Sequence, residues 1–248
     1  MALTGLFYPW GIILQILAVV HFVRRRPDTY WLWIIIIGGG LGALVYIAAE
    51  VVPDVVLFRG VFAGVSRRKR VRELEAIIQE NPAVGNLEEL ADLYLEEGQF
   101  ARARELYDKV LASRSDSFDA YYRRGLAELA LDDAKAAVVD LDRVVSTDPK
   151  YDFNRAIGLL AHACALTGQS ERADSLFQKA VAITTLSETY YNYAAFLADQ
   201  KRSAEARDYA QQVLARKTTM PRYLQRRERP WFRKAKALLN KLPASTTP

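Results

Sequence analysis

Two long apolar runs open the chain, and a charged, alanine-rich sequence follows them. The first run covers residues 6–23 and the second covers residues 31–52, with a short arginine-rich turn between them. A bilayer core about 30 Å thick is crossed by about 20 helical residues, and backbone polar groups in lipid have to be bonded within the helix. The pattern therefore predicts a transmembrane hairpin over residues 1–55.

A cleaved signal peptide is the alternative interpretation of the first run. Such a peptide has basic residues before its apolar stretch and small residues at its end. Residues 1–6 carry no basic side chain, and the run ends in Phe22, Val23 and three arginines. These features favour a retained helix.

Glycine is concentrated in the middle of the second run. Gly38 and Gly42 have the spacing of a GxxxG pair, which lets another helix approach closely. We interpret these glycines as a packing surface for the first run and not as a functional site.

The N-terminal region has a resemblance of its own. It has an apolar span, then an arginine-rich turn, then a second span that begins with Trp and contains the segment from Gly39 to Tyr46. This order resembles the two-helix module at the N-terminus of phospholipase D-type cardiolipin synthases. Those enzymes work through paired His-x-Lys-x4-Asp motifs, and neither His21 nor His162 begins one. The resemblance implies a shared anchor without the chemistry.

Basic residues flank the two predicted spans unequally. The turn carries three arginines at residues 24–26, and the segment after the second span carries Arg59, Arg67, Arg68, Lys69, Arg70 and Arg72. Because flanking positive charge tends to stay in the cytoplasm, the sequence predicts a multi-pass protein of a bacterial inner membrane. Its soluble domain is predicted on the cytoplasmic side, although the charges of the turn lie closer to the lipid and favour the periplasm. Residues 56–70 are interpreted as a basic juxtamembrane linker.

Farther along the chain, small and large residues recur with a regular period. Four units begin near residues 84, 118, 154 and 187, at spacings of 34, 36 and 33 residues. Repeats of this length are typical of solenoids, whose units stack because none can bury its apolar face alone. The pattern predicts an all-α solenoid with repeats at residues 84–117, 118–153, 154–186 and 187–220.

The residue types within each unit resemble the tetratricopeptide-repeat (TPR) family. In the first unit Ala91 and Ala103 occupy two of the family's small positions, and the other units also have glycine or alanine at both. The second unit departs from the family at Arg124 and Glu128, where large apolar residues are expected. This departure predicts a rotated or less tightly packed first helix in that unit.

Segments on both sides of the repeats are predicted to cap them, since arrays of this kind need solvated ends. Residues 71–83 read as the second helix of an incomplete unit. Residues 221–242 read as a basic capping helix, and residues 243–248 as a disordered tail.

The TPR resemblance implies a concave groove that is lined by the first helix of each unit and holds an extended peptide or a partner helix. The positions that map to this groove are Glu88, Asp92, Glu96, Tyr122, Leu126, Leu129, Arg155, His162, Tyr191, Ala195 and Asp199. Its acidic entrance and aromatic middle predict a basic or amphipathic partner segment. The Lys and Asn of the family's carboxylate clamp are missing, so capture of a C-terminal carboxylate is not expected.

Charge adds a second candidate surface. The net charge of +5, from 34 basic and 29 acidic residues, is mild. Contact with anionic lipid headgroups is predicted for Arg67, Arg68, Lys69, Arg70, Arg226, Arg227 and Arg233. A solvated capping face is the alternative, and nucleic acid is not expected because stacking aromatic residues are few there.

Residue types for catalysis are scarce. Cys164 is the single cysteine and occupies a core position, so it is interpreted as a buried, inert thiol. The sequence shows no nucleophile–base pair, phosphate loop or metal cluster, and no cofactor is predicted. The leading hypothesis is a membrane-anchored scaffold or adaptor that recruits a protein complex. A non-catalytic regulatory subunit of an envelope phospholipid enzyme comes second, and an enzyme in its own right comes third.

Overall fold

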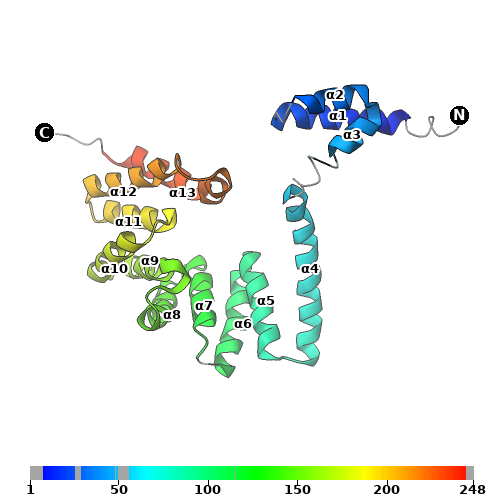
Figure 1. Ribbon diagram of the computed structural model, residues 1–248. Coiled ribbons are helices and arrows are strands. Elements are labelled where there is room, and N and C mark those ends of the chain that lie inside the picture. The colour runs from blue at the N-terminus through cyan, green and yellow to red at the C-terminus, as the bar shows by residue number, and fades with distance from the viewer. Residues whose placement is uncertain (1–7, 26–28, 48, 50–55, 115, 244–248) are drawn as a thin grey trace. The chain divides into compact units, whose positions relative to one another are not determined.

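The computed structural model describes residues 8–25, 29–47, 49, 56–114 and 116–243. The regular elements of these residues are all helices, labelled α1 to α13 in Figure 1. Contacts divide the chain into two compact units, Met1–Arg70 and Val71–Pro248. The predicted tail lies outside the described residues except for Pro243.

The first unit contains α1 (Tyr8–Arg25), α2 (Tyr30–Ile37), α3 (Gly39–Tyr46) and the beginning of α4 (Val56–Glu80). Its small core consists of Ala18, Trp31, Ile35, Ala43 and Tyr46. Polar residues of the first apolar run are bonded inside this unit: Gln15 Nε2 donates to the Ile35 carbonyl at 3.0 Å, and His21 Nδ1 lies 2.8 Å from the Tyr46 hydroxyl. Ile37 and Leu41 remain exposed.

Glycine breaks the second apolar run into two short helices. The N–H of Gly38 bonds to the Ile34 carbonyl and ends α2. Gly39 then adopts a φ of +54°, which residues with a Cβ rarely take. A Cβ at Gly42 would overlap the Ile34 carbonyl oxygen, so α3 can approach the end of α2 only with glycine there. The helix α3 also lies close to α1, where a Cβ at Gly40 would lie 3.0 Å from the Gly11 Cα.

The prediction of two membrane-spanning helices, and with it the multi-pass location in a bacterial inner membrane, is wrong. Within the described residues, no helix combines the length and the apolar character needed to cross a bilayer. The helix α1 has 18 residues that include Gln15, His21 and two arginines, and α2 and α3 have 8 residues each. The prediction treated residues 31–52 as one helix, and the break at Gly38 and Gly39 removes that length. Residues 48 and 50–52 of the second predicted span lie outside the described residues.

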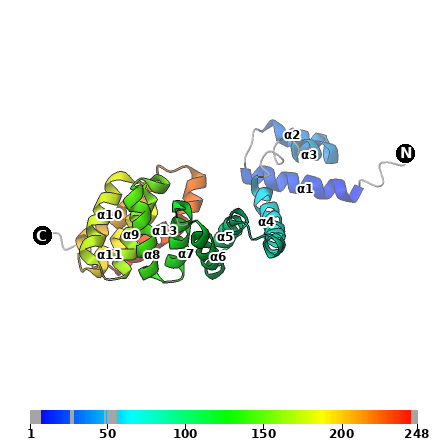
Figure 2. The ribbon, with the colours of Figure 1, turned by 90° about the horizontal axis from the view of Figure 1, so that it is seen from below.

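The second unit is a stack of antiparallel helix pairs. The pairs are α5 (Val84–Glu96) with α6 (Phe100–Ser113), α7 (Phe118–Ala130) with α8 (Ala134–Thr147), α9 (Tyr151–Leu166) with α10 (Ser170–Ile183), and α11 (Ser187–Asp199) with α12 (Ser203–Arg216). A last helix, α13 (Arg222–Lys241), packs on α11 and α12. Figures 1 and 2 show the pairs following one another along a curved path. The predicted all-α solenoid is confirmed.

Small residues let the paired helices pack closely. The repeated alanines Ala103, Ala137, Ala173 and Ala206 are completely buried. A Cβ at Gly125 would lie 3.0 Å from the Leu141 Cγ, so glycine permits the contact of α7 with α8. Large side chains such as Tyr107 and Phe177 fill the space beside these crossings and are buried as well. The core therefore follows the alternation of small and large residues seen in the sequence.

The turn inside each helix pair uses a left-handed residue. Positive φ angles of 75°, 62°, 77° and 61° occur at Gly98, Asp132, Gly168 and Lys201, which are spaced by 34, 36 and 33 residues. These spacings are the ones between the starts of the repeats. Glycine takes this conformation without strain and is the common residue after a helix C-terminus. Asp132 and Lys201 therefore hold a strained conformation that the repeat imposes.

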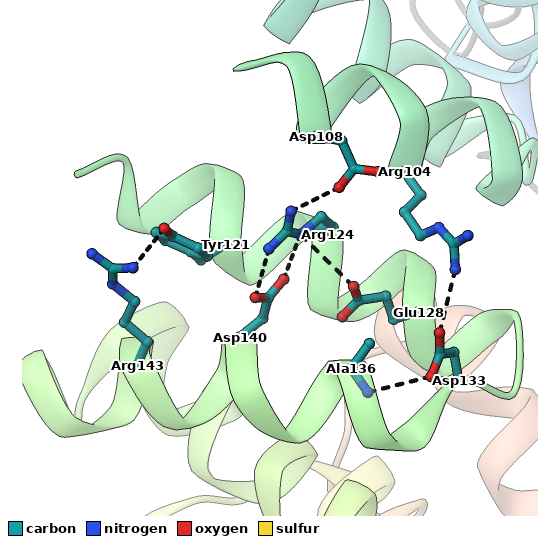
Figure 3. A network of polar contacts seen from close by, with 9 residues as sticks. All are labelled: Arg104, Asp108, Tyr121, Arg124, Glu128, Asp133, Ala136, Asp140 and Arg143. Carbon is teal, nitrogen blue, oxygen red and sulfur yellow. Dashed lines mark hydrogen bonds and ion pairs between the residues drawn. The ribbon is translucent and has the colours of Figure 1, made fainter. Parts of the chain in front are cut away.

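In the second repeat, Arg124 is accommodated by ion pairs, and Glu128 lies 3.7 Å from Arg124 one turn along the same helix (Figure 3). Arg124 lies between Asp140 of α8 and Asp108 of α6, and its Nη1 is 2.7 Å from the Asp108 Oδ1. Glu128 is only 4% exposed, and burial raises its pKa to about 8; nearby Asp140 adds to the rise and Arg124 opposes it. The expected loosening of α7 is not observed, because Gly125 packs tightly on Leu141 and Arg124 pairs with carboxylates of α6 and α8.

Candidate partner-binding groove

Two cavities lie side by side along the first helices of the pairs. The cavity between α7 and α9 has a volume of 320 Å³ and is lined by Asp119, Tyr122, Arg123, Leu126, Tyr151, Asp152 and Arg155. The cavity between α9, α11 and α13 has a volume of 380 Å³ and is lined by Arg155, Leu186, Glu188, Arg227, Glu228 and Trp231. Arg155 borders both cavities, so they adjoin each other, and we call the two cavities together the groove.

Carboxylates and guanidinium groups alternate along the groove. Arg123 Nε donates to Asp119 at 2.6 Å, and Arg123 Nη1 lies 3.3 Å from Asp92 of α5. Arg155 Nε donates to Glu188 of α11 at 2.7 Å. Asp92, one of the acidic entrance residues predicted from the sequence, is therefore paired with arginine. Asp119 and Arg123 are one helical turn apart, a spacing at which opposite charges attract, and this was the signal in the sequence for the pairing.

Two tyrosine–aspartate hydrogen bonds cross between α7 and α9. The Tyr122 hydroxyl donates to Asp152, and the Tyr151 hydroxyl donates to Asp119 at 2.6 Å. The two rings lie 5.0 Å apart between centroids. Burial raises the pKa of both tyrosines, so the hydroxyls stay protonated and act as donors at neutral pH. Tyr122 is only 5% exposed, so it forms the floor of the groove and offers little surface for contact with a partner.

A left-handed turn interrupts the beginning of α9 next to the groove. Asp152, Phe153 and Asn154 have φ angles of 47°, 54° and 65°. Residues with a Cβ pay a conformational cost in this region of φ, and strain of this kind often occurs at functional sites. The turn leaves Phe153 89% exposed. No glycine marks it in the sequence, which is why the sequence did not predict it.

The helix α13 covers part of the predicted groove. Tyr191 lies against Trp231 of α13, with ring centroids 5.7 Å apart, and Lys234 Nζ is 4.5 Å from the centre of the Trp231 ring. His162 is partly buried, and burial lowers its pKa; Glu188 opposes this effect and Lys234 adds to it. Ala195 is partly buried, and Asp199 is exposed near the end of α11.

The predicted entrance residues on α5 lie outside the two cavities. Asp92 accepts a hydrogen bond from the Tyr107 hydroxyl at 2.6 Å, and burial raises the pKa of Asp92 while that bond and Arg123 lower it. Glu88 is 4.0 Å from Arg114, and Glu96 is exposed. Leu129 is partly buried against the core.

Of the predicted groove residues, the structure thus brings Tyr122, Leu126 and Arg155 into the cavities. The sequence interpretation missed Asp119, Arg123, Tyr151, Asp152, Leu186, Glu188, Glu228 and Trp231.

The residues predicted to contact lipid headgroups belong to different units. Arg67, Arg68, Lys69 and Arg70 lie on α4 in the first unit, with Arg68 and Lys69 exposed. The others, Arg226, Arg227 and Arg233, are exposed on α13.

Cys164 is fully buried on α9, and burial raises the pKa of its thiol. A thiol in such surroundings is a poor nucleophile. The described residues contain no group of three or more His, Cys, Asp or Glu side chains that could hold a metal ion.

Known proteins similar to this chain share its repeats. Residues 88–152 match the family model described as tetratricopeptide repeat. DnaJ homolog subfamily C member 3 is 33% identical over 91 residues in both Mus musculus and Homo sapiens, a match that covers 37% of this chain and 18% of either relative. The chain therefore spans less than a fifth of the length of these relatives.

Solved structures agree with the family match. MamA from Desulfovibrio magneticus is 24% identical with a TM-score of 0.57, over 66% of this chain and 95% of that one. YrrB, described as a TPR protein with an unusual peptide-binding site, is 16% identical with a TM-score of 0.53, over 64% of this chain and 82% of that one. At these identities the likeness shows the fold alone. The α-solenoid of this chain is a tetratricopeptide-repeat domain.

Proposed function

We propose that this chain is a non-catalytic adaptor whose TPR domain binds an extended, amphipathic segment of a partner protein in the groove. The observation that carries the proposal is that two adjoining cavities, both bordered by Arg155, lie along the first helices of successive pairs. Repeat solenoids create extended concave surfaces that they use for binding, and YrrB is described as a TPR protein with an unusual peptide-binding site.

The chemistry of the groove suits an extended backbone. Such a backbone presents N–H donors and C=O acceptors in alternation, and each loses its water on binding. Asp119, Asp152 and Glu188 offer acceptors, and Arg123 and Arg155 offer donors, at intervals along α7, α9 and α11. Leu126 and Trp231 supply apolar contacts near the two ends of the groove. A segment with both apolar and polar side chains matches this surface better than a purely basic one.

Site-specific photocrosslinking in the full chain tests the proposal. A photoactivatable phenylalanine analogue replaces Leu126 in the groove or, as the control, Gln211 on the exposed side of α12. We expect a protein adduct from position 126 and none from position 211. The crosslinked segment is then synthesised, and its affinity for the full chain and for Arg155→Gln is measured.

Loss of a charge-assisted hydrogen bond of the kind Arg155 provides is expected to weaken binding roughly tenfold. Adducts that form at position 211 alone, or a segment that binds Arg155→Gln as tightly as the unaltered chain, would move the partner site out of the groove.

A further inference from the structure

Two faces of the helix α13 line two different cavities. Arg227, Glu228 and Trp231 border the groove. A second set of side chains, spaced three and four residues apart and therefore on one helical face, borders a separate cleft against the end of α12. The cationic residues of this cleft are Lys217, Arg226, Arg229, Arg233 and Lys236. This cleft lies outside the groove, and an inference drawn from it does not depend on the proposed function.

The cleft has a volume of 490 Å³, which is within the range of ligand sites, roughly 300–1,000 Å³. Its apolar part is formed by Leu214, which is partly exposed, and by Phe232, which is almost fully buried. Gln225 completes the lining, and no carboxylate takes part in it. The cleft therefore combines concentrated positive charge with a small apolar patch.

The cations of the cleft differ from the arginines of the repeats. Arg123, Arg124, Arg155 and Arg202 each pair with carboxylates on the same or a neighbouring helix. Over residues 8–25, 29–47, 49, 56–114 and 116–243, no ion pair involves any of the five cleft cations, and all five are exposed.

Like charges three or four residues apart on one helix repel each other. Arg226, Arg229, Arg233 and Lys236 make three such neighbouring pairs on α13. An anionic ligand in the cleft would remove this repulsion, whereas the folded domain itself supplies no counter-charge there within its described residues.

We infer that this cleft binds an acidic peptide segment of a partner protein, with carboxylates on the arginines and an apolar side chain on Leu214. Guanidinium groups match carboxylates in a two-pronged geometry, and the apolar patch requires a ligand that carries an apolar group as well as charge. Nucleic acid fits less well, because single strands bind by stacking bases on exposed rings and Phe232 is buried. The flat surface of an anionic vesicle would meet the outer guanidinium groups without reaching Leu214.

The test measures binding of the full chain to a fluorescent synthetic peptide of glutamates with one central leucine. The cleft variant Lys217→Gln/Lys236→Gln is compared with Lys179→Gln/Lys241→Gln, in which the same substitutions remove the same charge from exposed lysines that do not line the cleft. We expect the cleft variant to bind the peptide roughly three- to tenfold more weakly, because exposed ion pairs contribute little each. The control is expected to bind like the unaltered chain, and replacing the leucine by glutamine is expected to weaken binding as well.

Parallel titrations use single-stranded poly-dT and vesicles containing phosphatidylglycerol. The inference fails if the peptide does not bind, if the two variants lose affinity equally, or if the leucine makes no difference. It also fails if poly-dT or the vesicles bind more tightly than the peptide and depend on the cleft lysines. Circular dichroism of each variant verifies that the helices are intact.

Discussion

Arg124 donates two hydrogen bonds to Asp140, from Nε to Oδ2 at 2.7 Å and from Nη2 to Oδ1 at 2.8 Å. Asp140 is only 2% exposed, so this pair joins α7 to α8 in a place that water barely reaches. Removing one member of a buried pair leaves the other charge without compensation.

Asp140→Asn is therefore expected to lower the free energy of unfolding by roughly 3–5 kcal/mol, measured by urea denaturation of the full chain. Asp142→Asn is the matched control on the same helix, because Asp142 pairs with Arg172 at the exposed surface. Exposed pairs contribute up to about 1 kcal/mol. Equal losses in the two variants would contradict the structural role of the Arg124–Asp140 pair.

Glu128 predicts a pH dependence of stability. Its pKa is raised from 4.5 to about 8 in the folded chain, mainly by burial. The folded state therefore keeps a proton that the unfolded state has lost, and the contribution of Glu128 to stability is fully present only below its unfolded pKa. It is lost progressively as the pH rises through the folded pKa.

Between about pH 6 and about pH 9, ionisation of Glu128 should cost roughly 2 kcal/mol of stability. Glu128→Gln cannot ionise, and its denaturation midpoint should change less over the same range. An identical pH dependence in the variant and the unaltered chain would show that Glu128 is not the group responsible.

The left-handed turns predict opposite effects for two glycine substitutions. Gly168 has a φ of +77°, whereas Gly85 lies in the first turn of α5 and has no positive φ. At neither position would an added Cβ come within 4 Å of the surrounding atoms. Gly168→Ala should be destabilising by about 1–2 kcal/mol because of backbone strain alone. Gly85→Ala should be stabilising by about 0.5–1 kcal/mol, because alanine favours the helix.

Lys201→Gly should be stabilising by up to about 1 kcal/mol, because Lys201 holds a φ of 61° at the same position of the last repeat. Thermal denaturation of the three variants is the measurement. A loss of stability in Lys201→Gly would mean that the Lys201 side chain stabilises the fold by more than the left-handed backbone conformation destabilises it.

Tyr122 predicts a coupling between α7 and α9. Tyr122→Phe removes the hydrogen bond to Asp152 and leaves that carboxylate with fewer donors, which should cost roughly 1–3 kcal/mol. Tyr209→Phe is the control, since within the described residues no hydrogen bond involves the Tyr209 hydroxyl although its ring packs on Tyr193. A double-mutant cycle with Asp152→Asn checks the assignment, because the two substitutions should not be additive.

The solenoid could be predicted from the sequence because its repeats depend on local geometry. Residues such as Ala91, Ala103 and Gly125 recur where helices cross, and the large residues recur beside them. Helical periodicity alone places these residues on one face, so stacking follows from their spacing. The turns at Gly98 and Gly168 repeat with the same period.

The first unit shows where periodicity was insufficient. Hydropathy alone read residues 31–52 as one helix, but the chain turns at Gly39 with a φ of +54°. Glycine is compatible with a continued helix and with a left-handed break, and packing against the rest of the unit decides between them. The membrane prediction was wrong for this reason.

Helix positions near the groove were predictable from the sequence, but the pairing of charges across it was not. The sequence by itself placed Tyr122, Leu126 and Arg155 on the first helices of the repeats, because a helix position follows from the period. Only the tertiary structure decided that Arg123 reaches Asp92 and Arg155 reaches Glu188, and that α13 presents separate faces to the groove and to the basic cleft. The charge that a groove presents depends on distances of a few ångströms between side chains from different helices, and such distances are set by packing and not by the order of residues along the chain.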